Sequence, residues 1–135
     1  MKEVRIGIIG TGIMGTAHAR SLEKGNISRA RLTALCDINP DKLTKFTGDY
    51  KKFTDSRELI RSGEVDAVII ATPHYFHTTI GVDSLDNGLH TLTEKPISVH
   101  KADAEKLIAA HKRNPKPIFA AMFNQRTNPV YIKLR

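Results

Sequence analysis

Residues 4–15 of the chain have the sequence VRIGIIGTGIMG. The first six of these residues are almost all apolar, which is typical of a strand in a parallel sheet with both faces covered. The next six, Gly10-Thr11-Gly12-Ile13-Met14-Gly15, form a GxGxxG pattern that opens a helical stretch ending near Lys24. A strand, a glycine-rich turn and a helix in this order predict the first βα unit of a doubly wound α/β fold.

The rest of the chain continues this alternation of strands and helices. Further strands are expected at 31–36, 52–54, 65–71, 90–93 and 118–123, and further helices at 40–48, 55–63, 76–87 and 100–113. The last helix is expected to bury one stripe of side chains, formed by Ala104, Leu107, Ile108 and His111. Because βαβ crossovers are right-handed, this order predicts one parallel, six-stranded Rossmann sheet with the strand order 3-2-1-4-5-6.

Each glycine of the GxGxxG pattern has its own expected role at a dinucleotide site. Gly10 permits the tight turn, Gly12 lets the backbone approach a pyrophosphate, and Gly15 lets the helix pack closely on the strand. The backbone amides at the helix start, which include those of Ile13 and Met14, are then available to hold the phosphates. The pattern is weak in isolation, but its place between a strand and a helix favours cofactor binding over a purely structural turn.

Asp37 ends the second expected strand, 22 residues after Gly15. The dinucleotide motif has an acid about 20 residues on, which accepts hydrogen bonds from the adenosine ribose. A carboxylate there repels a 2′-phosphate, and residues 38–40 contain no Arg or Lys, so NAD is favoured over NADP. A helix-capping role for Asp37 is the alternative.

Composition and charge argue against several other classes of protein. The 21 Lys and Arg outnumber the 14 Asp and Glu, but they are dispersed along the chain, so no nucleic-acid partner is expected. Apolar runs are far shorter than the ~20 residues of a membrane-spanning helix, and the first residues lack a secretory signal, so no membrane association is expected. The single cysteine, Cys36, cannot form an internal disulfide, which favours a cytoplasmic location.

Later segments carry more specific motifs. Residues 65–73 form an apolar strand that ends in Thr-Pro and is followed by His77; residues 94–96 read Glu-Lys-Pro; and residues 123–126 read Phe-Asn-Gln-Arg, with Pro129 beyond them. In this order the motifs resemble the Gfo/Idh/MocA (glucose–fructose oxidoreductase / inositol dehydrogenase) family, over essentially the whole chain. The resemblance implies an oxidoreductase that transfers a hydride between a nicotinamide cofactor and a hydroxyl-bearing carbon of a sugar, a cyclitol or a derivative.

The same resemblance implies which residues form the site. Those that would line the nicotinamide half of the cofactor are Thr72, Pro73, His74, His77, Glu94, Lys95 and Pro96. Lys95 would bind the substrate hydroxyl and help transfer its proton, and Arg126 would also contact the substrate. The family commonly has Asn where this chain has His74. His74 and His77 lack a third ligand nearby in the sequence, so no metal site is expected.

Members of this family are much longer than 135 residues. Residues 1–123 are therefore expected to form the NAD(P)-binding domain, and residues 124–135 to begin the connection to a C-terminal α/β substrate domain that this chain lacks. The chain alone is expected to bind its cofactor with little or no turnover, because no pocket orients a sugar or polyol substrate. Two alternatives stay open: a free-standing NAD-binding sensor or accessory module, and a structural protein with a vestigial site. Whether the chain is itself an enzyme, and whether it forms a homo-oligomer, stay open too.

Overall fold

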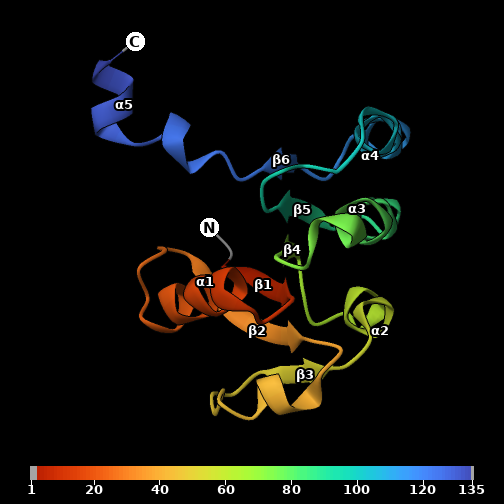
Figure 1. The fold of residues 1–135 in the computed structure, drawn as a ribbon. Helices are drawn as coiled ribbons and strands as arrows, with labels where there is room; N and C mark the ends of the chain where they lie inside the picture. Colours follow the sequence, from red (N-terminus) through yellow and green to blue (C-terminus); the bar gives the residue numbers. More distant parts are fainter. Residues whose placement is uncertain (1–2, 135) are drawn as a thin grey trace.

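The computed structural model describes residues 3–134 as a six-stranded parallel sheet with helices on both faces (Figure 1). The strands are β1 (Val4–Ile9), β2 (Ala30–Cys36), β3 (Lys51–Phe53), β4 (Ala67–Ile70), β5 (His90–Thr93) and β6 (Phe119–Ala121). The helices are α1 (Ile13–Glu23), α2 (Ser56–Arg61), α3 (His77–Asp86), α4 (Lys101–Arg113) and α5 (Pro129–Lys133), with single 3₁₀ turns at η1 (Pro40–Leu43), η2 (His74–Phe76) and η3 (Asn124–Arg126). The strand order is β3-β2-β1-β4-β5-β6, so the predicted Rossmann topology is confirmed.

Two apolar clusters hold the layers together, one on each face of the sheet. Neighbouring residues of β1 supply both: Ile8 packs in the cluster that includes Ala19 of α1, and Ile9 packs in the cluster that includes Leu59 of α2. Successive side chains of a strand point to opposite faces, so a strand covered on both sides must be apolar throughout. Figure 1 shows the same division, with α2, α3 and α4 in a column on one side and α1 on the other.

Two local predictions were wrong, each because tertiary packing decided the geometry. The helix expected at 40–48 is only the single turn η1, and the chain leaves it to carry Phe46 into the core, where this side chain is fully buried. In α4 the buried residues are Leu107 and Ala110, whereas Ile108 is 45% exposed. The expected stripe is thus confirmed at Leu107, which contacts α3 at Gly81, and Ala104 and His111 are half-buried; only Ile108 is displaced, by Ala110.

The C-terminal segment lies apart from the layered body. After β6 the chain passes through η3 and α5, beyond the edge strand of the sheet (Figure 1). Residues 1, 2 and 135, which the predicted domain ranges include, lie outside the described residues. Among the helices that the structure describes, none has both the length and the apolar character needed to span a bilayer.

Candidate cofactor site

The candidate site lies at the carboxyl edge of the sheet, between β1 and β4. The two strands are hydrogen-bonded neighbours, yet the chain leaves β1 for α1 on one face and leaves β4 for α3 on the other. Ligands of open α/β sheets bind in the crevice at such a topological switch point. Most of the predicted site residues lie on the loops that follow β1, β2, β4 and β5 at this edge.

Gly10 and Gly15 are required by the fold itself. Gly10 has a φ of +92°, and a Cβ atom there would lie 2.7 Å from the carbonyl oxygen of Ala71. A Cβ atom on Gly15 would overlap the carbonyl oxygen of Gly10. Both glycines therefore let α1 start directly against the ends of β1 and β4, as the motif predicts.

Gly12 differs from its two neighbours in the motif. It has a φ of −65° and a ψ of −159°, which other residues also adopt, and a Cβ atom there would meet nothing within 4 Å. Neither backbone conformation nor packing in the described chain requires a glycine at this position. The space above Gly12 is instead open, as a site for a closely approaching ligand requires.

The start of α1, next to this open space, has amides that precede the hydrogen bonds of the helix. Gly12 is the N-cap and gives no side-chain cap, and the first turn has no acidic residue. The first hydrogen bond of the helix runs from the Thr16 amide to the Gly12 carbonyl, so the amides of Ile13 and Met14 precede the intrahelical ladder. Ile13 is 90% exposed, which keeps the helix end accessible. Amides and helix dipole together make this end a favourable place for an anion.

Asp37 lies at the end of β2, where its carboxylate holds the phosphate loop. Oδ2 accepts hydrogen bonds from the amide of Thr11 (2.8 Å) and from its hydroxyl (3.0 Å), and Oδ1 accepts one from the amide of Asn39 (3.0 Å). Burial alone raises the pKa of Asp37, but these hydrogen bonds outweigh it, so the pKa is lowered. The cap of η1 is Asn39, which argues against the helix-capping alternative for Asp37.

Two lysines that the sequence analysis did not single out flank this corner. Lys42 Nζ lies 3.8 Å from Asp37 Oδ1. Lys45 Nζ donates to the hydroxyl of Thr16 (3.0 Å). Lys42 lies within the proline-initiated turn η1 after β2 and Lys45 follows that turn, and this position is the signal by which the sequence could have indicated them. They give the loop a positive border suited to a polyanionic dinucleotide.

After β4 come Thr72 and Pro73 in a loop, then His74 at the start of η2 and His77 at the start of α3. His77 is 0% exposed, and its ring nitrogens lie 2.9 Å from the carbonyl oxygen of Pro96 (Nδ1) and 3.0 Å from that of Thr72 (Nε2). His77 thus joins two loops, and its contact with a cofactor stays a prediction. His74 and Pro73 are exposed. Within residues 3–134, the buried hydroxyl of Thr72 has no hydrogen-bond partner, which fits a site completed by a ligand.

The Glu94-Lys95-Pro96 segment follows β5, and the peptide bond between Lys95 and Pro96 is cis. Glu94 is only 5% exposed; its Oε1 lies 2.7 Å from Nε2 of His18, and its Oε2 accepts a hydrogen bond from the amide of Lys95 (3.2 Å). The sequence analysis did not include His18. Its position on α1, three residues after Gly15, is the signal that could have indicated it, since residues three apart share a helix face.

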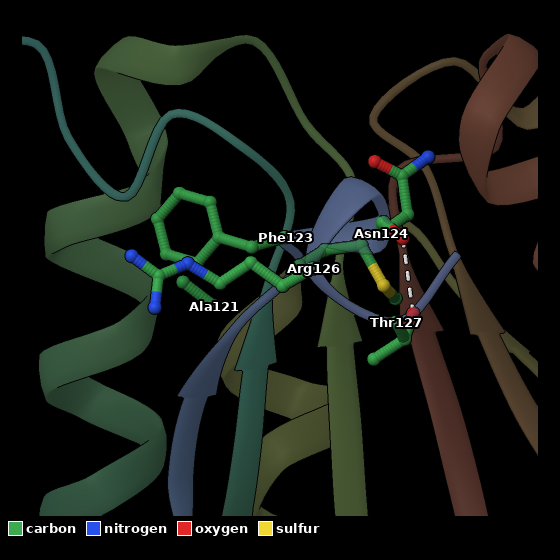
Figure 2. Close-up of a pocket in the computed structure, with 6 residues that line it drawn as sticks. Ala121, Phe123, Asn124, Arg126 and Thr127 are labelled. Atoms are coloured by element: carbon green, nitrogen blue, oxygen red, sulfur yellow. Dashed lines mark hydrogen bonds between the residues drawn. The ribbon is translucent and has the colours of Figure 1, made fainter. Parts of the chain in front are cut away.

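Lys95 and Arg126 are both exposed and line one open cleft of about 720 Å³. The other residues that line the cleft are Pro96, Met122, Phe123, Asn124 and Gln125. Figure 2 shows the guanidinium group of Arg126 beside the ring of Phe123, 5.9 Å from its centre. In the part of the chain that the structure describes, no group of three or more His, Cys, Asp or Glu could hold a metal ion.

Comparison with known proteins identifies a family and relatives that match almost the whole chain. Residues 4–122 match the family model described as "Oxidoreductase family, NAD-binding Rossmann fold" (Gfo/Idh/MocA). The chain is 30% identical to inositol 2-dehydrogenase 1 of Saccharopolyspora erythraea over 136 residues, and 33% identical to myo-inositol 2-dehydrogenase of Thermotoga maritima over 135 residues; each alignment covers 98% of this chain and 40% of the relative.

A solved structure shows the same likeness. The scyllo-inositol dehydrogenase of Lactobacillus casei, with bound NAD(H) and scyllo-inositol, superposes with a TM-score of 0.92 at 28% identity, over 98% of this chain and 40% of that one. The chain therefore spans about 40% of the length of the relatives it matches.

Proposed function

The chain belongs to the Gfo/Idh/MocA family of oxidoreductases, as the NAD-binding Rossmann domain of that family, and we propose from this that it is the cofactor half of a dehydrogenase acting on a cyclitol or a sugar. Residues 1–123 then form the cofactor domain, and residues 124–135 begin the connection to a substrate domain. The inositol dehydrogenases among its relatives support this substrate class.

The observation that carries the proposal is the open space at Gly12. Glycine is unnecessary there for the described fold, but it is needed if a pyrophosphate comes into contact with the backbone. The amides of Ile13 and Met14 would hold the phosphates, and Asp37, already oriented by Thr11, would accept a hydrogen bond from the adenosine ribose. The carboxylate retains acceptor capacity for this bond, because two oxygens offer about four lone pairs.

The remaining predicted residues are assigned to the nicotinamide end. In a doubly wound fold the second half of the sheet receives the second mononucleotide, and β4 and β5 belong to that half. The Thr72 hydroxyl would bond the cofactor near Pro73 and His74, and its lack of a partner in the described structure supports this assignment.

Lys95 is proposed as the group that handles the substrate proton. A bound nicotinamide would supply the hydride acceptor for the carbon that bears the hydroxyl group, and that hydroxyl would have to lose a proton as its carbon becomes a carbonyl. Lys95, exposed at the cleft it shares with Arg126, would bind that oxygen and, acting as the neutral amine, take up the proton to become the ammonium. Arg126, which lines the same cleft from the segment after β6, would also contact the substrate.

Calorimetric titration with NADH tests the proposal directly. We expect a single site that binds NADH and ADP-ribose, and no detectable oxidation of myo-inositol by the chain alone. Absence of heat and of a thermal shift with millimolar ligand would reject the proposed function in favour of a vestigial site.

Replacing Asp37 by Arg is expected to reverse the cofactor preference. The change removes the ribose acceptor and places a third cation beside Lys42 and Lys45, where a 2′-phosphate would bind. The affinity for NADH should fall at least tenfold, or about 1.4 kcal/mol, while the affinity for NADPH rises. Asp41→Arg, which adds the same charge on the exposed turn η1, is the matched control and should leave the preference unchanged. An unaltered preference in Asp37→Arg would exclude the ribose role.

Asp37 should also make stability depend on acid pH. Its pKa is lowered in the folded chain, so its contribution is fully present above the unfolded value of about 3.9 and is lost as the pH falls through the folded value. Urea unfolding between about pH 2 and pH 6 should therefore show a smaller loss of stability in Asp37→Asn than in the unmodified chain. If the free energy of unfolding falls equally with pH in the two proteins, Asp37 does not have a lowered pKa in the folded chain.

A further inference from the structure

We propose that His18 is a positioning residue that couples the pyrophosphate-binding helix to Lys95, with Glu94 as the link; this inference rests on the proposed function. His18 belongs to α1 and Glu94 follows β5, 76 positions later in the sequence. Their 2.7 Å side-chain contact joins the helix of the phosphate loop to the Glu-Lys-Pro segment.

The Glu94 carboxylate is held on both sides. One oxygen lies 2.7 Å from His18 Nε2, and the other accepts the backbone N–H of Lys95 at 3.2 Å. Glu94 is 5% exposed, so in the described structure its carboxylate relies on protein partners rather than on bulk water. Leaving a buried charged acceptor unpaired is among the more costly local defects, so removal of His18 should displace Glu94 and with it the backbone of Lys95.

A second contact restricts how the Glu-Lys-Pro segment can move when His18 is removed. The carbonyl of Pro96, on the other side of Lys95, faces Nδ1 of the buried His77, whose other nitrogen faces the carbonyl of Thr72. The residues on both sides of Lys95 are thus each held by an imidazole, whereas its own side chain is exposed at the cleft. His77 fixes the segment to the β4 loop, and among the side-chain hydrogen-bond contacts of residues 3–134 it is that of His18 which connects the segment to the helix that would bind the pyrophosphate.

This arrangement predicts an effect confined to the nicotinamide end of the cofactor. ADP-ribose carries the adenosine, the pyrophosphate and the second ribose but no nicotinamide, so it engages α1 without needing the Glu-Lys-Pro segment in place. NADH would place its nicotinamide at the β4 and β5 loops, so its binding depends on the position of the Glu-Lys-Pro segment. The ratio of the two affinities reports on the position of the segment, whereas a general loosening of α1 would weaken both ligands alike.

The test compares His18→Leu and His18→Gln by calorimetry with NADH and with ADP-ribose. In His18→Leu we expect the affinity for NADH to fall about tenfold and that for ADP-ribose to change less than about twofold. Gln retains an N–H that can donate to Glu94, so His18→Gln should recover most of the NADH affinity. His100→Leu, which removes an exposed histidine at the N-cap of α4, is the control and should alter neither affinity.

Equal losses for the two ligands, or no loss for NADH, would overturn the inference. Failure of the unmodified chain to bind ADP-ribose would instead overturn the proposed function and this inference together, so the two failures are distinguishable. If His18→Leu does not fold, the NMR resonance of the Lys95 backbone amide in the unmodified chain tests the coupling instead. It should shift when ADP-ribose is added, because the bound helix acts on it through His18 and Glu94, and an unmoved resonance would contradict the coupling.

Discussion

Gly12→Val is expected to abolish NADH binding while the chain keeps its fold. The new side chain would occupy the space into which the Cβ atom of residue 12 points, where the described chain has no atom within 4 Å. A bound pyrophosphate must enter that space to reach the amides of Ile13 and Met14. We expect the affinity for NADH to fall more than 100-fold, and that for ADP-ribose to fall with it, since both ligands carry the pyrophosphate.

Thermal stability is the control for Gly12→Val. The backbone at residue 12 suits other residues, and the loss of a glycine N-cap should lower the free energy of unfolding by no more than about 1 kcal/mol. Calorimetric titration and thermal unfolding of the same preparation separate the two effects. Retained affinity would show that the ligand does not approach Gly12, and the assignment of the loop would fail.

Gly15→Val should have the opposite effect and lower the stability of the fold itself. A Cβ atom at residue 15 would overlap the carbonyl oxygen of Gly10, a backbone atom that cannot move aside as a side-chain tip can. The first turn of α1 would have to shift away from β1 and β4. We expect a loss of about 3 kcal/mol or more and a melting temperature lower by about 10 °C.

The pair of valine variants adds the same atoms at two glycines of one motif. Gly12→Val should reduce binding and spare stability, whereas Gly15→Val should reduce stability first. A Gly15→Val protein that unfolds at the temperature of the unmodified chain would show that the close contact with Gly10 is readily relieved, and the structural role assigned to this glycine would be wrong.

Much of the fold could be predicted because it depends on local patterns. The apolar strand before Gly10, the helix after it and the regular alternation that follows each depend on residues close in sequence, and right-handed crossovers leave few sheet orders to choose from. The length of η1 and the buried face of α4 were not predictable in this way. They depend on where Phe46 and Leu107 pack, and those contacts form between elements distant in the sequence.

The candidate site also contains residues that local sequence patterns predict and contacts that depend on long-range packing. The glycine motif and Asp37 are recognisable because their spacing along one βα unit reflects the chemistry of a dinucleotide. Glu94 and His18 can each be indicated by local spacing, but their side chains meet only after the sheet places α1 beside the end of β5, so no local pattern indicates that contact. The same holds for His77, which the sequence indicated as a cofactor residue and which the structure places between two backbone carbonyls.

The most direct test of this account is a crystal structure of the chain grown with NADH. The account predicts pyrophosphate oxygens within hydrogen-bond distance of the amides of Ile13 and Met14, with the phosphate in contact with Gly12. A dinucleotide bound elsewhere on the chain, or a start of α1 that stays empty with saturating NADH, would contradict it.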